Sequence, residues 1–262
     1  MRLIHFFFGL SAYAAFHAVF IYFAGFLANF QVPKSINTPV VGNSIFQSLA
    51  IDVVLIALFA VHHSAAPRAF FKKWLQKHIP AHLERSVYVM MSSILLALLM
   101  WQWMPVTQEI WRVEDSFGKF PITVLFVAGV VSALVASFHI DHYDLFGMRQ
   151  VYCHLRNLPY TPPIFNEKGL YKVVRHPIML GTLVVLWATP VMTVGHFLFA
   201  ISMSLYIFIG TFLEERDLLV TLGGTYGNYQ KRVPMIVPFF RGRRPTRRKQ
   251  SAAEGGGTPS GQ

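Results

Sequence analysis

The stretch "PIMLGTLVVLWATPVMTVGHFLFAISMSLYIFIGTFL", residues 177–213, is about twice as long as one membrane-spanning helix. A spanning helix needs roughly 20 mostly apolar residues, each adding about 1.5 Å of length. Pro190 and Gly195 stand near the middle of the stretch, where they favour a turn. We therefore predict a helical hairpin made of two helices of about 15 to 18 residues each.

Four further apolar segments satisfy the same length criterion, at about residues 3–30, 46–66, 86–107 and 120–140. The whole chain is 54% hydrophobic and only 13% charged, and its mean hydropathy is +0.45. This composition is typical of an integral membrane protein and excludes an ordinary soluble domain. We predict an all-α, polytopic transmembrane helical bundle with a C-terminal helical hairpin. The first segment is expected to be a retained span rather than a removed signal peptide.

The net charge of +11 is distributed unevenly between the loops. The loop at 67–85 and the tail after 240 are rich in lysine and arginine, whereas the loops at 31–45 and 108–119 hold few basic residues. The positive-inside rule places both termini, the 67–85 loop and segment 141–176 in the cytoplasm. Basic residues in such a chain determine topology and contact lipid headgroups, so we expect the lipid bilayer and not nucleic acid as a partner. The single Cys153 excludes an internal disulfide and a cysteine-based zinc cluster.

Three polar stretches fall on the predicted cytoplasmic side. They are "HIDHYDLFGMRQVY" at 139–152, "NEKGLYKVVRHP" at 166–177 and "EERDLLVTLGGTYGNYQKRVP" at 214–234. A helical hairpin brings its two ends together, so the second and third stretches should meet in space. The first stretch can close the same pocket.

The start of the hairpin has the features of an anion site. Pro177 suits the first position of a helix, where its missing N–H costs nothing. The free amides there favour a carboxylate, and Arg175 would strengthen that preference. Gly181 would let another group approach the backbone closely. The alternative is a capped span in which Arg175 extends to the lipid headgroups.

The end of the hairpin carries acidic residues, whereas its start has the positive character of an anion site. Glu214, Glu215 and Asp217 could accept hydrogen bonds from an ammonium group or ribose hydroxyls, or attract a sulfonium. The alternative is a set of interfacial charges paired with Arg216 and Lys231. Acidic residues so close to a span favour a functional role, and the two ends together would suit a zwitterionic ligand.

The sequences "GLYKVVRHPIMLG" and "EERDLLVTLGGTYGNYQKRVP" resemble the isoprenylcysteine carboxyl methyltransferase-like membrane proteins. This superfamily includes phospholipid methyltransferases and NnrU-type proteins, and the match covers about residues 140–238. Within it, "DHYDLFGMRQVY" and "WATPVMTVGHFLFA" are most similar to the bacterial methanethiol S-methyltransferase family. The resemblance implies an inner-membrane enzyme that transfers a methyl group from S-adenosylmethionine to a small thiol, converting methanethiol to dimethyl sulfide. A prenylated-cysteine or lipid substrate is the alternative, as is a non-enzymatic NnrU-like membrane protein.

The resemblance also implies a set of cofactor-binding residues at the cytoplasmic face. They are Gln150, Tyr171, Arg175, His176, Pro177, Met179, Glu214 and Glu215. Met179 stands where many relatives have tyrosine, so a contact through a tyrosine hydroxyl is excluded at this position. The predicted organisation is a four-span region at 1–140, a cofactor-binding methyltransferase core at 141–240, and a basic, disordered tail at 241–262.

Methyl transfer to a thiol benefits from a base or from a group that stabilises the thiolate. The candidates lie at the end of the fourth span: His139, Asp141, His142, Asp144 and Arg149. If the helix continues, residues 139 and 142 share a face, as do 141 and 144. The alternative is an interfacial polar cluster without a role in catalysis. The other histidines, including His5, His17, His62, His63 and His196, are interpreted as boundary or packing residues, so no metal site is predicted. Asp52 is expected to make a polar contact between helices.

Overall fold

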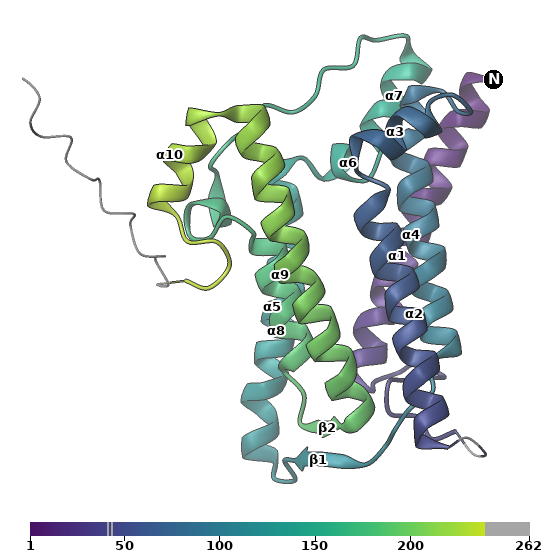
Figure 1. Cartoon of the computed structure of the whole chain (residues 1–262), viewed down its shortest axis with the longest axis vertical. Helices are drawn as coiled ribbons and strands as arrows, with labels where there is room; N and C mark the ends of the chain where they lie inside the picture. Colours follow the sequence, from purple (N-terminus) through teal and green to yellow (C-terminus); the bar gives the residue numbers. More distant parts are fainter. Residues whose placement is uncertain (41, 43, 239–262) are drawn as a thin grey trace, which may run out of the picture.

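The computed structural model of the 262-residue chain describes residues 1–40, 42 and 44–238 (Figure 1). Within these residues, five helices are long and apolar enough to cross a membrane. They are α1 (Arg2–Ala28), α2 (Ile45–Ala65), α4 (Glu84–Gln102), α5 (Ser116–Ile140) and α9 (Val194–Leu222). Large apolar side chains such as Val127 on α5 and Ile209 on α9 are exposed on the outside of the bundle, as lipid contact requires. The chain is an integral membrane protein, and the predicted helical bundle is confirmed.

Shorter elements connect the spans. Most of them lie at the two ends of the bundle, whereas the helix at 177–187 packs within it against α5 (Figure 1). The shorter elements are α3 (Ala69–Leu75), η1 (Ala81–Leu83), α6 (His142–Leu145), α7 (Met148–Arg156), η2 (Gly169–Lys172), α8 (Pro177–Trp187), α10 (Gly224–Arg232), and the strands β1 (Glu109–Arg112) and β2 (Val191–Thr193). The N-terminus, α3, α7 and α10 lie at one end, and the two strands lie at the other (Figure 1). Segments 67–85 and 141–176 therefore share one end of the molecule, as the charge pattern predicts.

The ends of the spanning helices follow local capping and proline chemistry. Asp115 accepts a hydrogen bond from the Gly118 amide, so α5 begins at Ser116, earlier than the predicted residue 120. Helix α4 ends at Gln102, earlier than the predicted residue 107, because Pro105 disfavours helical geometry in the residue before it. The Met104 amide there donates to the Asp52 carboxylate at 2.8 Å. Asp52 on α2 therefore makes a polar contact with the loop after α4, where a contact between helices was predicted.

The predicted hairpin is present, but the two helix lengths were predicted incorrectly: α8 has 11 residues and α9 has 29. Helix α8 stops early because Thr189 precedes Pro190. The chain then forms β2, which pairs antiparallel with β1 in a short ribbon that the sequence did not predict. Thr193 caps α9, and the helix continues to Leu222. Glu214 and Glu215 therefore lie within α9 and not after it.

A large apolar core runs through the bundle. Phe26, Trp103, Leu186 and Phe199 are almost completely buried at its centre. Helix α8 packs most extensively against α5, because Gly181 and Gly129 face each other with almost no space between the backbones. The core therefore crosses the predicted boundary at 140/141, and the division of the chain into units at 1–140 and 141–240 stays a prediction. The tail at 241–262 lies outside the described residues.

Candidate functional site

A buried ion pair joins the two ends of the hairpin. Arg175, two residues before α8, donates from Nε and Nη2 to the two carboxylate oxygens of Glu215 on α9, at 2.5 and 2.9 Å. Only 9% of each side chain is exposed. This two-pronged geometry is the strongest form of arginine–carboxylate contact. The predicted meeting of the second and third polar stretches is therefore confirmed.

Glu215 collects three further donors besides Arg175. His176 Nε2 lies 3.2 Å from Oε1, the Tyr226 hydroxyl donates to the same oxygen at 3.3 Å, and Gln230 Nε2 donates to Oε2 at 2.9 Å. A buried carboxylate is stable only when its charge is paired and hydrogen-bonded in this way. Glu215 is thus the centre of a network that holds α8, α9 and α10 together.

The segment after α10 closes over the same network. The Arg175 and His176 amides donate to the carbonyls of Pro234 and Met235 at 2.9 and 3.0 Å. The buried Tyr229 hydroxyl donates to the Tyr171 carbonyl at 2.6 Å. Burial raises the pKa of Tyr171, and it raises that of Tyr229 to about 12, so both phenols stay protonated. Tyr171 therefore lies beside the network, where the sequence places it.

Arg175 is already engaged by groups of the protein. Its Nη1 donates to the carbonyls of Gln230 and Val233 at 3.0 and 2.6 Å, in addition to the Glu215 pair. This geometry does not favour the predicted anion-binding role, because an incoming carboxylate would have to displace Glu215. Gly181 does permit the predicted close approach, but the approaching group is the α5 backbone.

The N-terminus of α8 has no side-chain cap. Pro177 is its first residue, as predicted, and the His176 side chain does not cap it. The first amides of a helix, here those of Ile178 and Met179, have no partner inside the helix and favour an anion.

Glu214 is the exposed carboxylate of the site. Its side chain is 52% exposed, whereas Glu215 beside it is buried. Its Oε2 lies 3.8 Å from His176 Nδ1, so the imidazole sits between the two glutamates. Glu214 can therefore accept hydrogen bonds from a ligand without disturbing the buried network.

A second polar cluster lies on α6 and α7. Arg149 pairs with Asp141 at 2.8 Å, and Asp144 accepts hydrogen bonds from Tyr160 at 2.8 Å and from Gln150 at 3.3 Å. Burial raises the pKa of Asp144 above its ordinary value, and burial together with Asp144 raises that of Tyr160 to about 12. Asp141, Asp144, Arg149 and Gln150 thus come together, in a cluster separate from the Glu215 network.

The two candidate histidines diverge, and the predicted shared face of residues 139 and 142 is wrong. Helix α5 ends at Ile140, and Asp141 has a non-helical backbone that turns the chain. His142 is buried, with its ring nitrogens bonded to Ser137 at 2.7 Å and to Tyr13 at 2.9 Å. His139 instead faces η2, where the Leu170 amide donates to its Nδ1 at 3.5 Å. Gly169, with a φ of +52°, leaves the space that this ring fills.

An open hollow adjoins His139. It is lined by Phe138, His139, Ile140, Asp141, His142, Tyr143, Asn166 and Lys168. Within the described part of the chain, two amide oxygens in this region are buried without a hydrogen-bond partner: Asn166 Oδ1 and Gln150 Oε1. Such acceptors are costly unless a donor reaches them.

Several residues of this region were not identified from the sequence. Gln230, Tyr160 and Asn166 lie in a helix end and a loop without distinctive spacing, and only the fold brings them to the site. Tyr226 and Tyr229 lie in the third polar stretch, at 214–234, and both are buried. Their aromatic character within a polar stretch was the available signal.

Comparison with known proteins finds several relatives that match two thirds or more of this chain. Methanethiol S-methyltransferase 1 of Bradyrhizobium diazoefficiens is 43% identical over 240 residues, which cover 92% of this chain and 84% of that protein. Methanethiol S-methyltransferase of Mycobacterium tuberculosis is 41% identical over 232 residues, covering 88% and 95%. Nurim of Mus musculus is 31% identical over 184 residues, covering 67% and 70%. No family model matches the chain, and no solved structure does so.

Proposed function

The chain belongs to the methanethiol S-methyltransferase family, and we propose that it methylates methanethiol to dimethyl sulfide with S-adenosylmethionine as the methyl donor. A methyltransferase requires a donor, and the residues of the site suit this one. The observation that carries the proposed site is the exposed Glu214 carboxylate, held beside the buried His176–Glu215 pair at the start of α8.

The chemical groups of S-adenosylmethionine have counterparts in this region. Its carboxylate suits the free amides at the N-terminus of α8. Its ammonium group or ribose hydroxyls suit Glu214, and its hydrogen-bond donors suit the unpartnered oxygens of Gln150 and Asn166. Tyr171, His176, Pro177 and Met179 would line this site. Arg175 and Glu215 would position it, because each is engaged by the protein itself.

The bound donor supplies an electrophilic methyl group on a sulfonium. The protein must hold the thiol sulfur in line with that carbon and exclude competing water. In that reaction the thiol would give its proton to water, its sulfur would bond to the methyl carbon, and S-adenosylhomocysteine would leave with the electron pair of the broken bond.

His139 is the candidate that we assign to the thiol. The Leu170 amide occupies its Nδ1 lone pair, so the neutral ring carries its proton on Nε2. That N–H can donate to a thiolate and stabilise it. Asp141, Asp144 and Arg149 are bonded to one another or to neighbours, and His142 is buried, so we assign them to supporting this end of the protein.

The site lies at the end of the bundle that carries the basic 67–85 loop. Through the positive-inside rule, this supports a cytoplasmic site in a bacterial inner membrane, with both termini in the cytoplasm. Cytoplasmic S-adenosylmethionine would then reach the site without crossing the bilayer.

The test uses the purified full chain in lipid nanodiscs with methanethiol and S-adenosylmethionine whose methyl group carries deuterium. We expect dimethyl sulfide with one deuterated methyl group, formed in equal amount to S-adenosylhomocysteine. A prenylated-cysteine acceptor and a phospholipid acceptor are offered in parallel. Labelling of either in preference to methanethiol would contradict the proposed substrate, and unlabelled product would contradict the proposed donor.

A further inference from the structure

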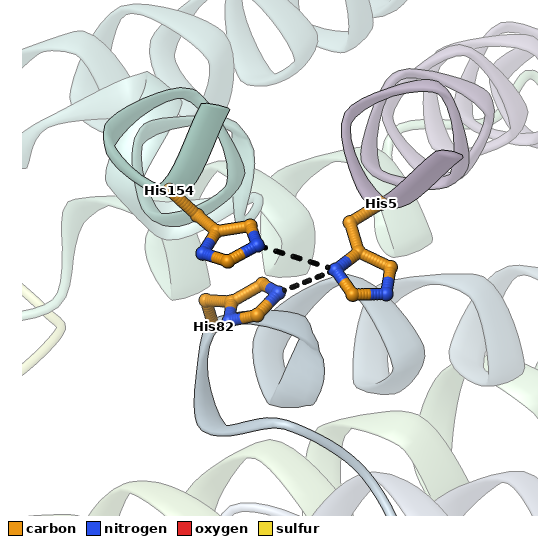
Figure 2. Close-up of side chains that lie close together, drawn as sticks. All are labelled: His5, His82 and His154. Atoms are coloured by element: carbon orange, nitrogen blue, oxygen red, sulfur yellow. Dashed lines mark hydrogen bonds between the residues drawn. The ribbon is translucent and has the colours of Figure 1, made fainter. Parts of the chain in front are cut away.

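Three histidines from distant parts of the sequence converge (Figure 2). They lie at the end of the bundle where Figure 1 shows α7 and the N-terminus. His5 lies on α1, His82 lies in η1, and His154 lies on α7. His5 Nδ1 is 2.8 Å from His82 Nε2 and 3.4 Å from His154 Nε2. One nitrogen from each ring lies within 4.8 Å of the other two. None of the three takes part in the Glu215 network.

One proton or lone pair on His5 Nδ1 cannot serve both neighbouring rings. A neutral imidazole nitrogen offers either one N–H or one lone pair, directed in the plane of the ring. Two other ring nitrogens approach His5 Nδ1, as Figure 2 shows, so a single proton or lone pair serves only one of them well. A cation that accepts one lone pair from each ring would satisfy all three.

We propose that His5, His82 and His154 bind a divalent transition-metal ion. Histidine is the commonest metal ligand in proteins, and three imidazoles select borderline ions such as Zn²⁺, Co²⁺, Ni²⁺ or Cu²⁺ over Mg²⁺ and Ca²⁺, which prefer oxygen. Three protein ligands around a tetrahedral ion leave the fourth position to water.

The separations between the ring nitrogens are close to those around a tetrahedral metal ion. Zinc–nitrogen bonds of about 2.0–2.1 Å place tetrahedral ligand atoms about 3.4 Å apart. The His5–His154 separation has this value, and the His5–His82 separation must widen. The rings of His82 and His154 are stacked at 3.6 Å with 13° between their planes. One of them must therefore rotate to direct its nitrogen at the ion. All three side chains are only partly buried, which leaves room for this rotation.

The ion would fasten α7 to the N-terminal part of the bundle. Val151 of α7 already fills the space left by Gly9 on α1, and Arg2 donates to Asn157 at 3.0 Å. Metal binding at His154 would fix the far end of α7, whose first turn carries Arg149 and Gln150. The ion therefore has a structural role, and binding should raise the thermal stability of the protein.

The first test uses the purified full chain with a purification tag that contains no histidine. After chelator treatment, Co²⁺ is added and the visible absorption of the ion is recorded. We expect one equivalent of Co²⁺ with the intense absorption of a tetrahedral site, displaced by Zn²⁺, and a higher thermal unfolding temperature. A folded protein that binds no Co²⁺, or binds it only with the weak absorption of an octahedral aqua ion, would overturn the proposal.

Variants identify the ligands. His82→Asn and His154→Asn should each weaken Co²⁺ binding at least tenfold, and His5→Asn should do the same. The matched control is His78→Asn, an exposed histidine in the same loop as His82, which should bind as the wild type does. Equal binding in all four variants would contradict the assignment. The absorption of the wild-type protein tests the site even where a variant fails to fold.

Discussion

Arg175 and Glu215 connect the start of α8 to the C-terminal part of α9 through two parallel hydrogen bonds, at 2.5 and 2.9 Å. The pair fixes the segment that carries His176 and leaves Glu214, one residue away along α9, exposed. The buried pair thus holds the groups that we assign to the cofactor without contacting the cofactor itself. Substitutions in the buried pair should therefore affect stability, whereas substitution of Glu214 should affect cofactor binding.

Removing one partner of the buried pair should destabilise the protein strongly. Arg175→Met leaves the Glu215 charge buried without its main partner, a loss of about 3–5 kcal/mol in comparable cases. Thermal unfolding in detergent, followed by tryptophan fluorescence, measures the effect. The double variant Arg175→Met/Glu215→Leu should regain part of the lost stability, because no unpaired charge remains. A single variant as stable as the wild type would show that the pair contributes little.

Gly181 should tolerate no side chain. A Cβ at this position would lie 2.6 Å from the Gly129 carbonyl oxygen and 2.9 Å from the Ala133 amide, both of them backbone atoms of α5. Gly181→Ala should therefore force α8 away from α5 and lower the unfolding temperature. Gly210→Ala is the matched control, since no atom lies within 4 Å of its added Cβ. Equal unfolding temperatures for the two variants would contradict this packing.

His139 should affect the thiol and not the cofactor. His139→Ala removes the Nε2–H that we assign to the thiolate, and kcat at pH 7 should fall about tenfold or more. The deficit should narrow as pH rises, because free thiolate then becomes abundant. Affinity for S-adenosylmethionine should be unchanged, and the exposed His78→Ala serves as the control. A uniform loss at every pH would contradict the proposed role of His139.

Asp144 should make stability depend on pH. Burial raises the pKa of this carboxyl, and the hydrogen bond from Tyr160 offsets only part of that rise. The folded protein therefore binds the proton more tightly than the unfolded chain does. The contribution of Asp144 to the free energy of unfolding is fully present below the ordinary pKa of aspartate, about 3.9. It is lost as pH rises through the raised pKa of the folded protein. Asp144→Asn should remove this loss, so the variant should gain stability relative to the wild type between pH 4 and neutrality. Parallel stability curves for the two proteins would contradict the expectation.

The sequence predicts those features that depend on composition and on neighbouring residues. Apolar length located the spans, the basic loops placed segments 67–85 and 141–176 at one end, and the turn at Pro190 brought His176 close to the two glutamates. The helix break at Asp141 was missed, because the apolar and polar pattern there also fits a continuing helix. The early end of α8 was missed for a similar reason, since the apolar run continues past Thr189.

Contacts between residues that lie far apart in the chain could not be predicted from the sequence. His5, His82 and His154 are separated by dozens of residues, and neither their spacing nor their neighbours suggest a common site. Tyr160 with Asp144 and Gln230 with Glu215 are closer in the chain, but only the fold brings each pair into contact. The different environments of Glu214 and Glu215 also depend on the fold, because their sequence context is almost identical.

Equilibrium binding of radiolabelled S-adenosylmethionine to purified Glu214→Gln tests the central claim most directly. Asp217→Asn, an exposed carboxylate on the same helix, is the control. We predict that Glu214→Gln keeps the wild-type unfolding temperature but binds the cofactor at least tenfold more weakly, with a matching loss of dimethyl sulfide, whereas Asp217→Asn behaves as the wild type. Wild-type cofactor affinity in Glu214→Gln would contradict the proposed site.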